Sequence, residues 1–149
     1  MQVHFVYGTE TSTAEFLCED LSNALPDGCS GTVSSMETVD PTTLDSSTFY
    51  VLVSSTFGSG DVPGTAVDFY EKLQKQSPDL SHVRFAVFGL GDTTFGETYN
   101  QGSEKLMTQM LACKATMVGE RGLFDSSSPD MPEDIAVPWL LGILETTDA

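Results

Sequence analysis

A chain of 149 residues, 40% of them hydrophobic, is typical of one globular domain, so we expect residues 1–149 to fold as a single unit. Its 22 Asp and Glu residues oppose only six Lys and Arg, and the formal net charge of −16 disfavours nucleic acid and anionic membranes as partners. No stretch approaches the roughly 18 consecutive apolar residues that a membrane span needs, and the first residues lack a basic leader, so we expect a cytoplasmic protein.

The first half of the chain predicts three strands and a helix. Residues 3–7 form a short apolar run that ends in Gly8, as a buried strand does. Residues 13–24 carry leucine at every fourth position, which indicates an amphipathic helix. Residues 32–39 are polar enough for an edge strand, whereas residues 49–53 are apolar throughout and predict a central strand covered on both faces.

The second half alternates helices and strands in the same way. It begins with a helix whose apolar residues are Val67, Tyr70 and Leu73. Strands are predicted at 83–88 and 115–118, with a helix at 102–113 between them. Pro132 suits the first turn of a last helix, although Pro138 argues against its continuity. The inward faces predicted for the last two helices consist of Leu106, Met107, Met110 and Leu111, and of Ile135, Trp139, Leu140 and Ile143.

This alternation of strands and helices predicts an α/β fold with a doubly wound sheet. We expect five parallel strands in the order 2-1-3-4-5, with helices on both faces. In such a sheet a ligand binds beyond the carboxyl ends of the strands. Because the loops after strands one, three and four leave this edge together, the sequence predicts the functional site there.

The three cysteines do not indicate a metal or a dithiol centre. Cys18, Cys29 and Cys113 are widely spaced and lack the CxxC or Cys/His spacing of such sites. Free cysteines are usually small buried hydrophobic residues, so we interpret all three as structural thiols. We expect neither a metal site nor a catalytic residue.

The loop after the first strand, GTETSTAE, is suited to hold a phosphate. A helix start offers unpaired N–H groups and a partial positive charge, and Thr9, Thr11, Ser12 and Thr13 add hydroxyls. No Lys or Arg precedes Lys72, so an anion in this half of the chain must be held by amides and hydroxyls. The spacing matches neither GxxxxGK[ST] nor GxGxxG. By itself, a Thr-rich turn of this kind is most often an ordinary helix cap.

The same loop resembles the phosphate-binding loop of flavodoxins, especially the FMN domains of cytochrome P450 reductase and sulfite reductase and the short-chain, MioC-like flavodoxins. Ser12 stands where these relatives usually have glycine. The resemblance implies a flavodoxin-like fold and an FMN cofactor. It also implies that Glu10 points outward while the phosphate is surrounded by the loop residues Thr9, Glu10, Thr11, Ser12, Thr13 and Ala14.

The loop after the third strand is similar to the flavin loop of the same relatives. An ordinary Gly-rich surface loop would have the same sequence pattern. The resemblance implies that Phe57 lies against one face of the isoalloxazine ring and that Gly58 supplies a peptide that can turn toward flavin N5. The cofactor-binding residues implied here are Ser54, Ser55, Thr56, Phe57, Gly58, Ser59 and Gly60.

The loop after the fourth strand contains GLGD followed by an aromatic residue, which resembles the most specific signature of the family. Phe95 matches the second stacking aromatic, and Tyr99 is its rival for that role. The residues implied to contact the ring are Leu90, Gly91, Asp92, Phe95, Tyr99 and Asn100. Asp125 could match an acid near the ring in the reductase domains, but we interpret it as a residue of a surface turn.

The resemblance implies a monomeric electron carrier that shuttles electrons between a reductase and an acceptor enzyme. The loops carry the acidic residues Glu10, Asp61, Asp92 and Glu97, so we expect partners with basic surfaces, such as a flavodoxin or ferredoxin reductase and a P450. The alternative is an FMN-binding accessory module that supports another enzyme without redox cycling.

A phosphorylation-driven response regulator would share this topology, but its chemistry does not fit. Such a protein needs an Asp after strand three and a Lys after strand five. The residues at those places are Ser54, Ser55 and Thr56, and Gly119, Glu120 and Arg121.

Overall fold

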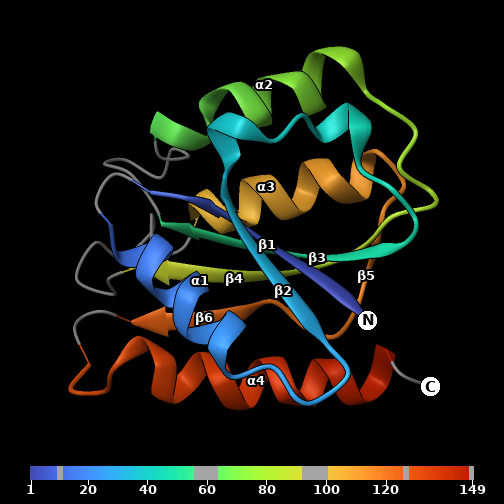
Figure 1. The fold of residues 1–149 in the computed structure, drawn as a ribbon. Helices are drawn as coiled ribbons and strands as arrows, with labels where there is room; N and C mark the ends of the chain where they lie inside the picture. Colours follow the sequence, from blue (N-terminus) through green and yellow to red (C-terminus); the bar gives the residue numbers. More distant parts are fainter. Residues whose placement is uncertain (10–11, 56–63, 92–100, 126–127, 148–149) are drawn as a thin grey trace.

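A six-stranded parallel sheet organises the computed structural model, which describes residues 1–9, 12–55, 64–91, 101–125 and 128–147 (Figure 1). Its strands are β1 (Gln2–Gly8), β2 (Ser30–Ser35), β3 (Thr48–Ser55), β4 (Arg84–Gly91), β5 (Thr116–Met117) and β6 (Gly122–Asp125). The order is β2-β1-β3-β4-β5, and β6 also pairs with β4. The predicted order 2-1-3-4-5 is therefore confirmed, and the sixth strand is an addition to it.

Helices cover both faces of the sheet (Figure 1). The helices α1 (Thr13–Asn23) and α4 (Pro132–Thr147) lie on one face, and α2 (Val67–Gln76) and α3 (Gln101–Ala112) lie on the other. The described parts of the connections contain three short 3-10 helices, η1 (Met36–Thr38), η2 (Pro41–Thr43) and η3 (Gly64–Ala66). Within the described residues, no helix has the length and apolar character needed to cross a bilayer.

The central strand β3 separates two hydrophobic clusters. Phe49, Val51 and Val53 belong to the cluster under α1 and α4, whereas Tyr50 and Leu52 belong to the cluster under α2 and α3. All five are at most 4% exposed. Full burial of a large apolar side chain contributes about 2 kcal/mol, so both faces of β3 stabilise the sheet. The prediction of a doubly covered central strand is confirmed.

The strand predicted at residues 32–39 is shorter than expected and starts earlier. β2 ends at Ser35, whose hydroxyl accepts a hydrogen bond from the Glu37 N–H at 3.2 Å. This local bond competes with strand pairing and begins η1.

The fifth position of the sheet is filled by two short strands instead of one. β5 pairs with the start of β4, and β6 pairs with its end. Between them Gly119 has φ +72°, a left-handed conformation that favours glycine. The hydrophobic face of α4 that covers β6 includes Trp139, whose ring lies 5.1 Å from that of Phe88 in β4.

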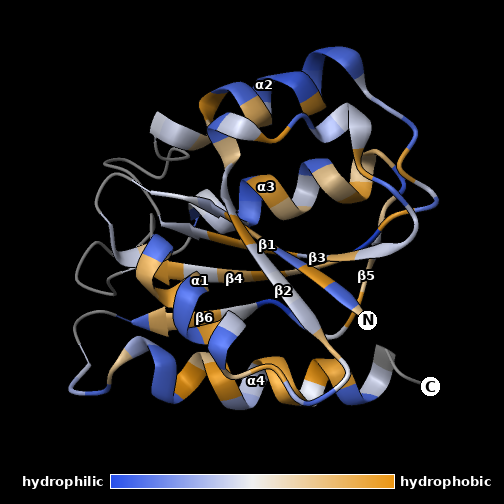
Figure 2. Ribbon diagram, in the orientation of Figure 1, coloured by the Kyte–Doolittle hydropathy of each residue, from blue (hydrophilic) through white to orange (hydrophobic). Residues whose placement is uncertain are grey.

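Two of the residues predicted to point inward are exposed. Leu111 on α3 is 44% exposed and Ile135 on α4 is 39% exposed, whereas Leu106, Met110 and Leu140 are fully buried as predicted. The colouring of Figure 2 shows hydrophobic and hydrophilic residues alternating along α4, which continues through Pro138.

The three cysteines are free thiols. Cys18 and Cys113 are buried, as expected, whereas Cys29 is partly exposed. No cluster of three or more His, Cys, Asp and Glu side chains suited to a metal ion occurs in the described part of the chain.

Candidate functional site

The carboxyl edge of the sheet brings together residues from all the loops that the sequence singles out. At this edge Gly8 of β1 pairs with Ser54 of β3, and Ser55 pairs with Leu90 of β4. α1 and α3 also start here (Figure 1). The predicted site residues that fall within the described part are Thr9, Ser12, Thr13, Ala14, Ser54, Ser55, Leu90 and Gly91.

The first loop is tied to the segment that follows the second loop. The Thr9 N–H donates to the Thr65 hydroxyl at 2.7 Å, and that hydroxyl donates to the Thr9 carbonyl at 3.0 Å. Thr9 is 8% exposed. This pair of bonds fixes the end of β1 against η3. Sequence reasoning missed Thr65, because no local pattern distinguishes it from a helix-start threonine.

The N-cap residue of α1 does not cap the helix with its side chain. Ser12 occupies the N-cap position, and its side chain accepts no hydrogen bond from the first turn. Its carbonyl accepts the Phe16 N–H at 3.0 Å, which is ordinary helix pairing. The Ser12 side chain therefore does not cap the helix, and Ser12 lies exposed at this edge.

The one acidic side chain in the first turn of α1 interacts with a tyrosine. Burial raises the pKa of Tyr7, and the nearby negative charge of Glu15 raises this pKa further.

Buried serine hydroxyls make hydrogen bonds at the end of β3 and at the start of α3. Ser54 is fully buried, and its hydroxyl donates to the Ser55 carbonyl at 2.9 Å. Ser103 in the first turn of α3 is also fully buried, and Arg121 donates to its hydroxyl at 2.9 Å. These bonds anchor the elements on either side of the second and third loops.

Asp125 does not lie in a surface turn. It is the last residue of β6 and pairs with Gly91 at the end of β4. Its side chain is half-buried. The short run Gly122–Asp125 resembles a turn in sequence, and only pairing with β4 makes it a strand. The structure therefore corrects our interpretation and places an acidic residue beside the GLGD segment.

The remaining site predictions lie outside the described residues. They are Glu10 and Thr11 in the first loop, Thr56, Phe57, Gly58, Ser59 and Gly60 in the second, and Asp92, Phe95, Tyr99 and Asn100 in the third. The choice between Phe95 and Tyr99 as the stacking residue stays open.

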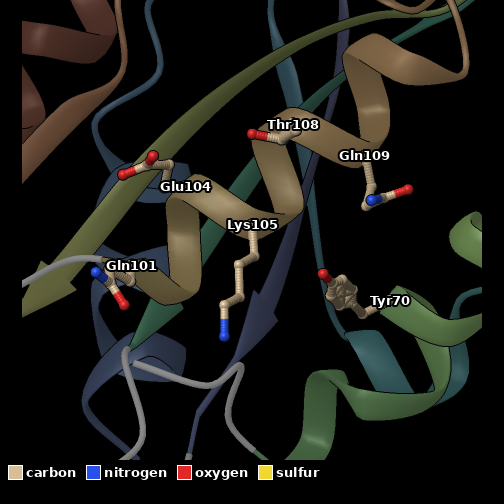
Figure 3. A pocket seen from close by; sticks show the side chains of 6 residues that line it. All are labelled: Tyr70, Gln101, Glu104, Lys105, Thr108 and Gln109. Carbon is tan, nitrogen blue, oxygen red and sulfur yellow. The ribbon is translucent and has the colours of Figure 1, made fainter. Parts of the chain in front are cut away.

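A separate groove lies between α2 and α3, on the other face of the sheet from α1 (Figures 1 and 3). It has a volume of about 180 Å³. Its lining consists of Tyr70, Gln101, Glu104, Lys105, Thr108 and Gln109. Figure 3 shows the Lys105 side chain extending from α3 beside Tyr70 of α2. None of these residues belongs to the predicted site.

The donors at the carboxyl edge fit a flavin mononucleotide. A phosphate needs N–H and O–H donors, and the start of α1 carries backbone amides and two hydroxyl residues, Ser12 and Thr13. A carboxylate at the N-cap would repel a phosphate, whereas the Ser12 side chain is neutral. The doubly wound parallel sheet and the donors at its carboxyl edge together define an FMN-binding electron-transfer domain of the flavodoxin type.

The chain belongs to the flavodoxin family, whose profile matches residues 5–139. It is 33% identical to Protein MioC of Escherichia coli K12 over 141 residues, which cover 93% of this chain and 92% of that protein. It is 35% identical over 142 residues to NADPH-dependent diflavin oxidoreductase 1 of Emericella nidulans, covering 92% of this chain and 21% of that protein.

Solved structures share the fold. A single-residue mutant of flavodoxin from Pseudomonas aeruginosa superposes with a TM-score of 0.86 at 23% identity, over 100% of both chains. Flavodoxins bind FMN, and this cofactor is the one that the family implies for the present chain.

Proposed function

We propose that this protein shuttles electrons between a reductase and an acceptor enzyme, with one non-covalent FMN as its redox group. The supporting observation is the convergence of the start of α1, where the Ser12 side chain makes no cap, with the ends of β3 and β4 at one edge of a flavodoxin sheet. We further propose that it acts as a monomer in the cytoplasm. We also propose that its partners present basic surfaces, because the net charge of −16 favours them.

The chain contributes binding and orientation, and FMN supplies the one- and two-electron chemistry when it is bound. The first turn of α1 holds the phosphate through Ser12, Thr13 and Ala14. The bonds between Thr9 and Thr65 keep the end of β1 against η3. Asp125 and the end of β4 add negative charge and backbone groups on the far side of the same edge.

A coupled assay tests the shuttling role. The FMN-loaded protein is mixed anaerobically with NADPH, a flavodoxin reductase and ferric cytochrome c, and haem reduction is followed by absorbance. We expect a rate proportional to the concentration of the protein, with the FMN-free protein as an inactive control. The rate should fall as salt rises, because the partners attract through opposite charges.

Two results would contradict this proposal. A protein that binds FMN firmly yet adds nothing to the reductase-only rate would favour the accessory module. A rate that does not change between low and high salt would contradict partners with basic surfaces.

A further inference from the structure

Arg121 is less exposed than the lysines that form ion pairs in the described part of the chain. Its side chain is 19% exposed, against 42% for Lys72 and 75% for Lys75. Taking a guanidinium out of water costs free energy unless hydrogen bonds and opposite charges compensate it. Arg121 donates to the Ser103 hydroxyl at 2.9 Å and lies 3.8 Å from the Glu104 carboxylate. Its guanidinium is therefore held against the first turn of α3.

The backbone beside Arg121 is fixed from the opposite face of the sheet. The Trp139 Nε1 atom of α4 donates to the Glu120 carbonyl at 3.0 Å. β6 begins directly after Arg121, where Gly122 pairs with Phe88 of β4. α3 and α4 lie on opposite faces of the sheet (Figure 1). The short segment before β6 thus binds α4 through its backbone and α3 through the Arg121 side chain, so α3 cannot shift against β6 without breaking this bond.

The two ends of β6 contact the two ends of one connection. Residues 92–100 join Gly91, the last residue of β4, to Gln101, the first residue of α3. Gly91 pairs with Asp125 at the end of β6. The first turn of α3 is bonded to Arg121, which immediately precedes β6. The segment from Arg121 to Asp125 therefore fixes both the departure and the return of the chain at the carboxyl edge.

We propose that Arg121 is a positioning residue for the FMN ring, because it holds the start of α3 against β6 at the edge where the ring binds. This inference rests on the proposed FMN-dependent function. A ligand of a doubly wound sheet lies at the switch point, here between β1 and β3, so a flavin whose phosphate is at the start of α1 has its ring beside the ends of β3 and β4. Arg121 acts on the ring through the bond to Ser103 and the start of α3.

Two variants break the same hydrogen bond from its two sides. Arg121→Gln removes the guanidinium, whereas Ser103→Ala removes the hydroxyl acceptor and leaves the positive charge in place. We expect each change to raise the Kd of the apoprotein for FMN about tenfold. The double variant should bind FMN no more weakly than either single variant, because both changes remove one shared interaction. If Arg121→Gln does not fold, Ser103→Ala decides the test.

Two matched controls isolate this bond from charge and from the neighbouring ion pair. Lys72→Gln also removes one cation that forms an ion pair on the same face of the sheet, but on α2. Glu104→Gln removes only the ion pair of Arg121 at 3.8 Å, whose carboxylate side chain is 56% exposed. Exposed ion pairs contribute little free energy, so both controls should bind FMN within about twofold of the parent.

The visible circular dichroism of bound FMN distinguishes placement of the ring from a general loss of stability. This signal arises from the fixed, asymmetric surroundings of the flavin ring. In FMN-saturated samples it should change in Arg121→Gln and Ser103→Ala and match the parent in both controls. Urea unfolding of each apoprotein gives its folded fraction, by which the Kd of that variant is corrected.

A Ser103→Ala protein with the corrected Kd and the visible circular dichroism of the parent would overturn the positioning role, even if Arg121→Gln binds FMN weakly, because the effect would then belong to the charge of Arg121. That result would leave the electron-transfer function intact. A parent apoprotein that does not bind FMN would overturn both.

Discussion

Ser12 is an N-cap residue whose side chain does not cap, and this property makes it a direct probe of the phosphate site. Ser12→Asp would place a carboxylate at the positive end of α1. That charge should stabilise the FMN-free protein by about 0.5 kcal/mol through the helix dipole. The same charge should weaken FMN binding at least about tenfold by repelling the phosphate.

Urea unfolding of the apoprotein and FMN titration measure these two opposed effects. Ser30→Asp provides the control, because Ser30 is exposed and begins β2 at the other end of the sheet. A Ser12→Asp protein that binds FMN as tightly as the parent would exclude this helix start as the phosphate site.

The cysteines should differ in reactivity according to their burial. Burial raises the pKa of both the Cys18 and the Cys113 thiol, and the charges of Glu15 and Glu19 raise that of Cys18 further. Since the thiolate is the reactive form, a disulfide reagent should modify Cys29 quickly in the native protein. Titration with Ellman's reagent should therefore count one fast thiol natively and all three cysteines in urea. Rapid native modification of Cys18 would be incompatible with this packing.

At the scale of elements, β6 depends on close contact with α4. A Cβ at Gly122 would lie 2.5 Å from the Phe88 ring and 2.8 Å from the Trp139 Nε1 atom, which donates to the Glu120 carbonyl. Gly122→Ala should therefore destabilise the protein by about 1–3 kcal/mol, the usual cost of overpacking.

Gly142→Ala is the matched control for this prediction. Gly142 lies in α4, and a Cβ there meets nothing within 4 Å. Alanine should stabilise the helix by about 0.5–1 kcal/mol. Chemical denaturation of both variants provides the comparison, and a Gly122→Ala protein as stable as the parent would contradict the close packing of β6.

The elements that the sequence predicted well are those with strong local signals. The apolar run at 49–53 became the centre of β3, and the leucine repeat became α1. β6 was not predicted because Gly122 and Asp125 are turn residues by type, and their strand conformation comes from pairing with β4.

The buried face of α4 also differs from the inward face that the sequence predicts. The small residue Ala136 takes a fully buried position, while the bulkier Ile135 is exposed. Hydrophobicity alone favours burial of the larger side chain, whereas packing against α1 and the sheet leaves room for the smaller one. The site prediction depended on family resemblance more than on periodicity, because the donors of a phosphate site are ordinary serines and threonines.

At the scale of the whole molecule, negative charge opposes folding. The net charge of −16 arises from 22 acids and six cations, so the compact state suffers self-repulsion at neutral pH. Raising NaCl from about 0.02 to about 0.5 M shortens the Debye length from roughly 20 Å to roughly 4 Å and should raise the Tm by several degrees. Differential scanning calorimetry checks this, with KCl as a control for ion-specific effects. A Tm that falls or stays constant would contradict the importance of repulsion.

The central claim is that the carboxyl edge of this sheet binds FMN, with its phosphate at the start of α1. Fluorescence titration of the apoprotein with FMN and, separately, with riboflavin tests both parts at once, because the two ligands differ only in the phosphate. We predict an FMN Kd below about 1 μM and riboflavin binding at least about 100-fold weaker, a difference of roughly 2.7 kcal/mol. Equal affinity for the two ligands, or binding of neither, would contradict the account.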